Sequence, residues 1–184
     1  MRDVAVTPTR GPVSNSHILL NLNYMYIHLS RMKSSTMPTL PCMCANLRRA
    51  ARSLTQRYDE ALRPLGLTIT QFTILQALSF AGEITQGALG EILAMDSTTL
   101  TRTLEVMNTH GWIEKKYGTD RRERQLRLTR TGKSEFNRAL PHWRSTQETL
   151  RVRLGKQRWD DLTKLINDTT SMIAEQGDLD GATV

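Results

Sequence analysis

Short hydroxyl side chains and one arginine form the group with the most informative chemistry: Ser97, Thr98, Thr99, Thr101 and Arg102. Threonine methyls can contact the methyl of thymine, hydroxyls donate or accept hydrogen bonds, and arginine can bind guanine through two parallel bonds. The alternative interpretation is a solvated helix face with a serine cap. These residue types therefore suit a DNA groove without requiring one.

A second polar group contains Asp120, Arg121, Arg122 and Arg124. In a tight turn the Asp120 carboxylate can hold the Arg122 guanidinium extended toward a narrow, electronegative minor groove. Arg121, Arg124 and Arg127 could then meet phosphates. The alternative is a surface ion pair of little energetic value.

The chain contains two cysteines, Cys42 and Cys44, which are too close together to staple a fold. The start of a helix and the nearby Arg48 and Arg49 would favour a thiolate at Cys44. Cys42 could resolve a sulfenic acid on Cys44 through a mixed or intersubunit disulfide. A metal site has little support, because no histidine is adjacent and no second cysteine pair exists. Inert thiols, a redox sensor and a metal site all stay open.

The basic excess of the chain is concentrated near the second polar group. The formal net charge is +7, and residues 113–138 contain nine basic and four acidic residues. A basic segment suits nucleic acid, an acidic membrane surface or an acidic protein. Here the arginines fall on an expected hairpin, so DNA is favoured. No run of about 18 apolar residues and no signal pattern is present, and we expect a cytoplasmic protein without a membrane partner.

The elements that would position these residues follow from apolar periodicity. We expect helices over 44–64, from a cap at Thr70 to Ala81, and from a cap at Thr85, where Leu89, Ile92 and Leu93 face inward. Asp96 or Ser97 caps the next helix, and three of its apolar residues recur at helical spacing: Leu100, Leu104 and Met107.

The remaining pattern predicts a hairpin followed by two helices. Gly111 ends the preceding helix, and residues 112–116 and 124–128 alternate as strands. A cap at Thr129 or Thr131 starts a helix over 132–154, and another covers 157–175. The fold class is mainly α with a small β-hairpin wing. Residues 1–36 are expected to be a disordered or dispensable extension, and residues 177–184 a flexible tail.

This order, together with GWIEKK at 111–116, DRR at 120–122 and LTRTGK at 128–133, resembles the MarR family of winged helix-turn-helix transcriptional regulators. The resemblance covers roughly residues 42–176. It implies dimerisation helices at 42–66 and 132–176 and a DNA-binding lobe at 67–131. It also implies a homodimer with a recognition helix in the major groove and a wing in the minor groove. Most members are repressors that release DNA when a small phenolic ligand or an oxidant arrives.

Apolar stripes on the last two helices support the dimer independently, because they exceed what a compact winged helix must cover. The position of Cys44 relative to Tyr58 is similar to that of the reactive cysteine in the family's organic-hydroperoxide-sensing branch, where the tyrosine bonds the thiolate across the dimer. The chain departs from that branch at Arg48 and Ile69, where the branch has tyrosines.

We therefore expect a sequence-specific regulator of double-stranded DNA with a pseudo-palindromic operator, acting as a homodimeric repressor and requiring no cofactor. The alternatives are a thiol-based redox enzyme and a protein-binding adaptor that keeps the winged-helix fold. Paired carboxylates, a phosphate loop and zinc spacing are absent from the sequence, which argues against an enzyme.

Overall fold

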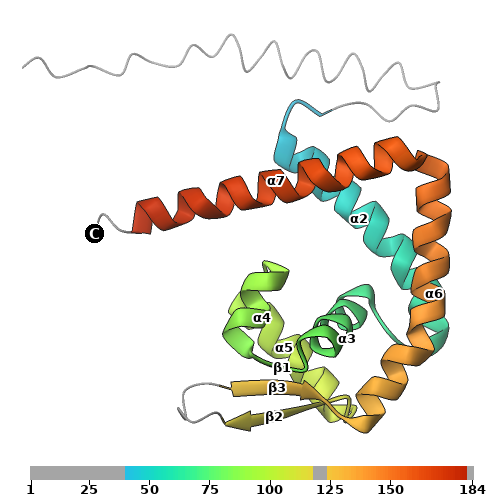
Figure 1. Ribbon diagram of the computed structural model, residues 1–184, viewed down its shortest axis with the longest axis vertical. Helices are drawn as coiled ribbons and strands as arrows, with labels where there is room; N and C mark the ends of the chain where they lie inside the picture. The colour runs from blue at the N-terminus through green and yellow to red at the C-terminus, as the bar shows by residue number, and fades with distance from the viewer. Residues whose placement is uncertain (1–39, 118–123, 182–184) are drawn as a thin grey trace, which may run out of the picture. The chain divides into compact units, whose positions relative to one another are not determined.

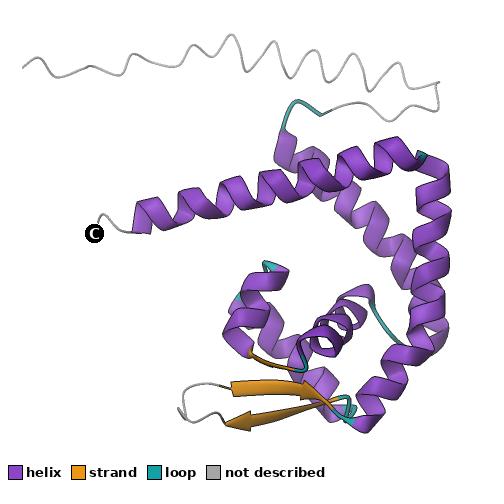
Figure 2. Ribbon diagram, in the orientation of Figure 1, coloured by secondary structure: helices purple, strands orange, loops and turns teal. Residues whose placement is uncertain are grey.

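The fold is mainly helical with one small antiparallel sheet (Figures 1 and 2). The computed structural model describes residues 40–117 and 124–181. The elements in chain order are α2 (Met43–Leu62), the 3-10 turn η1 (Arg63–Leu65), α3 (Ile69–Ala81), β1 (Glu83–Thr85), α4 (Gln86–Leu93), α5 (Ser97–Thr109), β2 (Ile113–Tyr117), β3 (Arg124–Leu128), α6 (Arg130–Leu154) and α7 (Lys156–Gly181). The described residues fall into two compact units, one that ends at Arg52 and one that begins at Ser53. The sheet and the helix-turn-helix belong to the second unit.

The helix starts are fixed by side-chain caps. Thr85 and Asp96 cap α4 and α5 as expected. The expected cap at Thr70 is wrong, because Thr68 caps α3 instead. The Thr68 hydroxyl accepts from the backbone N–H of Gln71, and the Gln71 side chain accepts from the backbone N–H of Thr68. This reciprocal pair satisfies two amide donors that the helix end would otherwise leave open.

The sheet contains a strand that the sequence pattern did not predict. The order is β1-β3-β2, and both pairings are antiparallel. β1 has only three residues, placed between two helices, so no alternation could identify it. It pairs with β3 from Glu83 opposite Arg127 to Thr85 opposite Gln125. Because Thr85 also caps α4, this pairing ties the start of α4 to the wing.

One apolar core holds the helix-turn-helix against the sheet. Leu100, Leu104 and Met107 on α5 are buried as expected. Phe72 of α3 stacks on Phe136 and Trp143 of α6, with ring centroids 5.5 and 5.6 Å apart. The expected inward position of Ile92 is wrong, because its side chain is 65% exposed. Only part of the short helix α4 faces the core, and Leu89 is its buried residue.

The hairpin and α6 are joined by close backbone packing. The Thr129 N–H and hydroxyl both donate to the Trp112 carbonyl, and the same hydroxyl donates to the Gly111 carbonyl at 2.6 Å. The Gly132 N–H donates to the Thr129 oxygen, which makes Thr129 the cap of α6. An added Cβ on Gly132 would lie 1.9 Å from the Trp112 carbonyl oxygen. The motifs GWIEKK and LTRTGK therefore meet at one joint.

α6 and α7 extend beyond the wing. α6 contains Pro141, and α7 continues to Gly181, whereas the sequence predicted an end near Glu175. Large apolar side chains on these helices are more than a third exposed: Val152, Leu154, Leu162, Leu165, Ile166, Met172 and Ile173. No described helix is long and apolar enough to cross a membrane. The expectation for residues 1–36 lies outside the described residues.

Candidate nucleic-acid interface

The α5 helix presents a polar surface at its start because Leu100, Leu104 and Met107 are held in the core. The Asp96 carboxylate accepts from the backbone N–H of Thr99 at 2.8 Å. Hydrogen bonds from Thr99 hold the pKa of this carboxyl below its ordinary value. Ser97, Thr98 and Thr99 are exposed in the first turn. The helix therefore begins with hydroxyl groups that a ligand can reach.

Farther along α5, the two remaining predicted DNA-binding residues differ in exposure. Arg102 is exposed, whereas Thr101 is half-buried. The predicted residues from Ser97 to Thr99 thus form a continuous exposed surface, whereas the side chain of Thr101 is partly covered.

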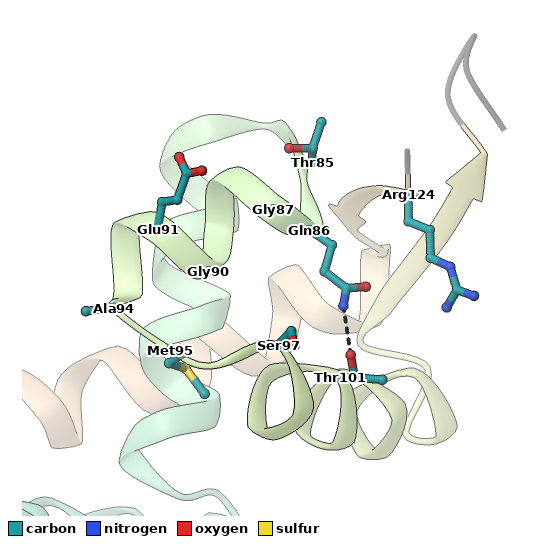
Figure 3. Close-up of a pocket in the computed structure, with 10 residues that line it drawn as sticks. All are labelled: Thr85, Gln86, Gly87, Gly90, Glu91, Ala94, Met95, Ser97, Thr101 and Arg124. Carbon is teal, nitrogen blue, oxygen red and sulfur yellow. Dashed lines mark hydrogen bonds between the residues drawn. The ribbon is translucent and has the colours of Figure 1, made fainter. Parts of the chain in front are cut away.

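A hollow of about 850 Å³ lies beside this surface (Figure 3). It brings Ser97 and Thr101 of α5 together with Arg124 of β3 and with Gln86 at the start of α4. Its remaining lining residues come from the end of β1, from α4 and from the turn after it: Thr85, Gly87, Gly90, Glu91, Ala94 and Met95. Ser97, Thr101 and Arg124 were predicted as site residues from two separate motifs, and the fold brings them together at one concave surface.

Gln86 is the site residue that sequence reasoning missed. Its Nε2 donates to the Thr101 Oγ1 at 2.9 Å, as the dashed line in Figure 3 shows. The two residues are far apart in the chain and belong to different helices. A glutamine in the first turn of an amphipathic helix carries no pattern that distinguishes it from a solvated residue.

The two described arginines of β3 lie in different electrostatic surroundings. Arg124 is exposed at the edge of the hollow, and no carboxylate partner is found for it in the part of the chain that the structure describes. Arg127 stands between Glu83 of β1 and Glu114 of β2 in the strand register, and its Nε donates to Glu114. This pairing argues against the expectation that Arg127 meets a phosphate, which stays untested.

The hydrogen bond between Arg127 and Glu114 also changes their ionisation. The bond to Arg127 lowers the pKa of Glu114, and the bond to Glu114 raises the pKa of Arg127. Each group therefore stabilises the charged form of the other. Asp120, Arg121 and Arg122, the tip of the expected wing, lie outside the described residues, and their roles stay predictions.

The cysteines belong to the other unit. Cys42 and Cys44 are both exposed and unpaired thiols. The Asn46 side chain organises this helix start, because its amide donates to the carbonyls of Leu40 and Cys42. Among the residues that the structure describes, no group of three or more histidine, cysteine or acidic side chains could hold a metal ion.

Tyr58, the predicted partner of Cys44, is bonded within its own chain. Its hydroxyl donates to the Gln147 Oε1 of α6, and partial burial raises the pKa of the tyrosine. The Tyr58 hydroxyl therefore ties α2 to α6. Its predicted role toward a thiolate of a second chain stays a prediction.

Comparison with known proteins identifies relatives of this fold. A family model described as the MarR family matches residues 65–123. The chain is 29% identical over 90 residues to YwoH, an HTH-type transcriptional regulator of Bacillus subtilis, across 49% of this chain and 66% of YwoH. It is 43% identical over 54 residues to the multiple antibiotic resistance protein MarR of Salmonella typhimurium, across 29% of this chain and 38% of that protein. The chain thus spans only part of these relatives.

Solved structures give longer matches. The transcriptional regulator MosR of Mycobacterium tuberculosis, in complex with DNA, is 37% identical with a TM-score of 0.63, across 71% of this chain and 98% of that one. A mutant MarR of Escherichia coli complexed with operator DNA has a TM-score of 0.63 at 23% identity, across 69% of this chain and 92% of that one, and it shows a likeness of fold. The family model and the nearly complete match to MosR show that the chain belongs to the MarR family of winged-helix transcriptional regulators.

Proposed function

We propose that this protein is a regulator that binds double-stranded DNA at a specific sequence through α5 and the wing. The observation that carries the proposal is the hollow where Ser97 and Thr101 of α5 meet Arg124 of β3. Hydroxyl donors and acceptors from a helix can read base edges, and an arginine without a carboxylate partner among the described residues can bind phosphate or a base. The MosR structure with DNA supports this use of the fold.

The α5 helix is suited to the major groove. Leu100, Leu104 and Met107 are buried while Ser97, Thr98 and Thr99 are exposed, so the N-terminal part of the helix can approach base edges. Ser97, Thr98, Thr99, Thr101 and Arg102 are the residues we assign to sequence reading. Asp120, Arg121, Arg122 and Arg124 are assigned to the backbone and the minor groove.

The protein would act as a homodimer on a pseudo-palindromic operator. Two recognition helices must lie about one helical turn apart, roughly 34 Å, to enter successive major grooves. The exposed apolar residues of α6 and α7 support dimerisation, because side chains such as Leu165 and Ile173 lose water contact when covered. An effector that favours another separation of the two helices would weaken DNA binding.

Repression relieved by an effector is the regulation we propose. The effector is a small phenolic ligand, or an organic hydroperoxide acting on Cys44 with Cys42 as the resolving thiol. The exposure of both thiols supports the second route, because an oxidant can reach them. Tyr58 would assist only if its hydroxyl left Gln147.

Selection of bound sequences from random double-stranded DNA tests the DNA-binding proposal. We expect the wild-type protein to enrich a pseudo-palindrome whose half-sites are about one helical turn apart. Its affinity should fall steeply with added salt, because phosphate contacts release counterions. Enrichment of no sequence, with a flat salt response, would refute the proposal and favour a protein-binding adaptor.

Operator binding before and after organic hydroperoxide tests the regulatory route. We expect oxidation to weaken binding by the wild type and to leave Cys44→Ser unaffected. Equal loss in both proteins would place the oxidation elsewhere. Sustained peroxide turnover with a thiol reductant would instead indicate a redox enzyme, since a sensor reacts stoichiometrically.

A further inference from the structure

Most threonines beyond the first turn of the described helices make the same hydrogen bond to the backbone, and Thr55 and Thr101 are the described threonines that do not. Beyond the first turn of each helix, the hydroxyls of eight described threonines donate to the carbonyl four residues earlier: Thr73, Thr103, Thr109, Thr146, Thr149, Thr163, Thr169 and Thr170. Thr101 could donate to Ser97 in the same way. Within the described residues it makes no such bond, and its oxygen accepts from Gln86 instead.

This exchange changes what Thr101 can offer to a ligand. A hydroxyl has one proton to donate and two lone pairs that accept. In the eight threonines named above, the hydroxyl proton is donated to a backbone carbonyl and is not available to a ligand. In Thr101 the Gln86 amide occupies one lone pair, so the proton stays available on the side that lines the hollow.

The position of the Gln86 side chain lowers the stability of the folded protein. Its Oε1 is buried and has no hydrogen-bond partner among the described residues. A buried amide oxygen without a partner is unfavourable, and an apolar side chain of similar length would avoid that loss. Folding stability alone therefore does not explain a glutamine at this position. Among the described residues, its side chain makes one hydrogen bond, to Thr101.

We propose that Gln86 is a positioning residue for sequence recognition, because its amide orients Thr101 as a hydrogen-bond donor toward the DNA. This inference rests on the proposed DNA-binding function and deepens it. Gln86 acts through Thr101 and not by its own contact with a base. The role needs no movement of either helix, because the bond already exists in the protein alone.

The inference predicts which base edges Thr101 favours. In the major groove, guanine O6 and N7, adenine N7 and thymine O4 accept hydrogen bonds, whereas the cytosine N4 amino group donates. A donor fixed at Thr101 favours an accepting edge and disfavours the cytosine amino group. Because a hydroxyl can still accept through its second lone pair, we expect a bias at one base pair and not absolute discrimination.

The test uses the full chain and the operator that the wild type selects from random DNA. Thr101→Val removes the hydroxyl while keeping the side-chain shape, and the base pair at which it loses discrimination is the one that Thr101 reads. Gln86→Met removes the amide while keeping its length. The double variant shows whether Gln86 acts through Thr101. Relative affinities for operators carrying each of the four base pairs at that position are the readout.

We expect Gln86→Met to reduce the preference at that base pair by roughly two- to tenfold, the range for one net hydrogen bond. In the Thr101→Val background the same change should cause no further loss. The Tm of Gln86→Met should be equal to or above that of the wild type, since the unpartnered oxygen is gone. Gln71→Met is the matched control. It breaks the cap of α3, so it should lower the Tm and leave base preference unchanged.

Several outcomes would overturn the inference. One is an unchanged preference in Gln86→Met, and another is an equal loss with and without the Thr101 hydroxyl. A preference for the cytosine amino edge would show that Thr101 accepts. A lowered Tm with a uniform loss of affinity would make Gln86 structural only. If Thr101→Val loses no discrimination at any base pair, Thr101 reads no base. If the wild type enriches no sequence, the proposed function itself fails.

Discussion

Gly132 occupies a place in α6 where no side chain fits. Its missing Cβ leaves room for the Trp112 carbonyl, which an added methyl would meet at 1.9 Å. That carbonyl accepts from Thr129 and so cannot turn away without breaking the bond. The glycine in the motif LTRTGK is therefore explained by close backbone approach. Its backbone φ is not positive, so left-handed geometry is not the reason.

Replacing Gly132 by alanine should lower the free energy of unfolding by about 1–3 kcal/mol, because the added methyl forces the hairpin away from α6. Urea denaturation of both proteins measures this difference. Gly87→Ala is the matched control, since its Cβ would meet only the Thr85 oxygen at 4.0 Å. Equal stability of Gly132→Ala and the wild type would show that the joint yields easily.

Asp96 makes the stability of α5 depend on pH in the acidic range. Its pKa is lowered in the folded protein by hydrogen bonds from Thr99, so the folded state binds the proton more weakly than the unfolded state does. The stabilisation is present above the ordinary pKa of the carboxyl and is lost as the pH falls through the lowered value. Asp96→Ser keeps a capping oxygen without this titration.

We expect the wild type to lose more thermal stability than Asp96→Ser between pH 5 and pH 3. Melting curves at several pH values measure the difference, and a common Tm shift from other carboxyls cancels between the two proteins. Parallel pH profiles would show that the Asp96 carboxylate does not contribute through its charge.

At the scale of elements, apolar periodicity was sufficient to predict the helices but not the residues that they contact. Leu100, Leu104 and Met107 were predicted as core because a single helix face determines their burial. The cap of α3 was misassigned because two threonines, Thr68 and Thr70, lie at the start of the helix. The spacing of Thr68 and Gln71 that forms the capping box distinguishes them.

The candidate site shows the same limit. Arg127 was expected to meet phosphate, yet the strand register places it between Glu83 and Glu114. The position of Glu83 depends on β1, which is too short to be read from a pattern, whereas Glu114 faces Arg127 within the hairpin itself. The role of Gln86 depends on Thr101, a neighbour only in the folded chain. Residue types could thus be predicted locally, whereas their partners required the sheet pairing and the packing of α4 on α5.

The two arginines of β3 give a matched test of the wing. Arg124→Ala should weaken operator binding by about 1–3 kcal/mol if it contacts DNA, and a phosphate contact would reduce the salt slope by about one. Arg127→Ala should leave the salt slope unchanged, because Glu114 already neutralises that guanidinium. Gel-shift titrations at several salt concentrations measure both. Equal effects of the two changes would contradict the distinction between a free and a paired arginine.

For the whole molecule, the described residues leave several large apolar side chains exposed on α7. On α7, Leu165 is 63% exposed and Ile173 is 61% exposed. Scattered apolar residues are normal at a surface, but a set repeated along one helix is typical of an interface. A partner that must also align two recognition helices on a pseudo-palindrome is most simply a second copy of the same chain.

If the proposed dimer forms through α7, Leu165→Asp should dissociate it and weaken operator binding, because a carboxylate buried in an apolar interface would have no compensating partner. A loss of about 2 kcal/mol or more, roughly thirtyfold in the dimer dissociation constant, is expected if Leu165 lies near the interface centre. Sedimentation equilibrium measures it. Ile92→Asp is the control, since Ile92 is 65% exposed on α4 and outside the proposed interface. A Leu165→Asp protein that stays dimeric at the wild-type concentration would remove α7 from the interface. The dimer would then depend on other surfaces, and the spacing of the recognition helices would need another origin.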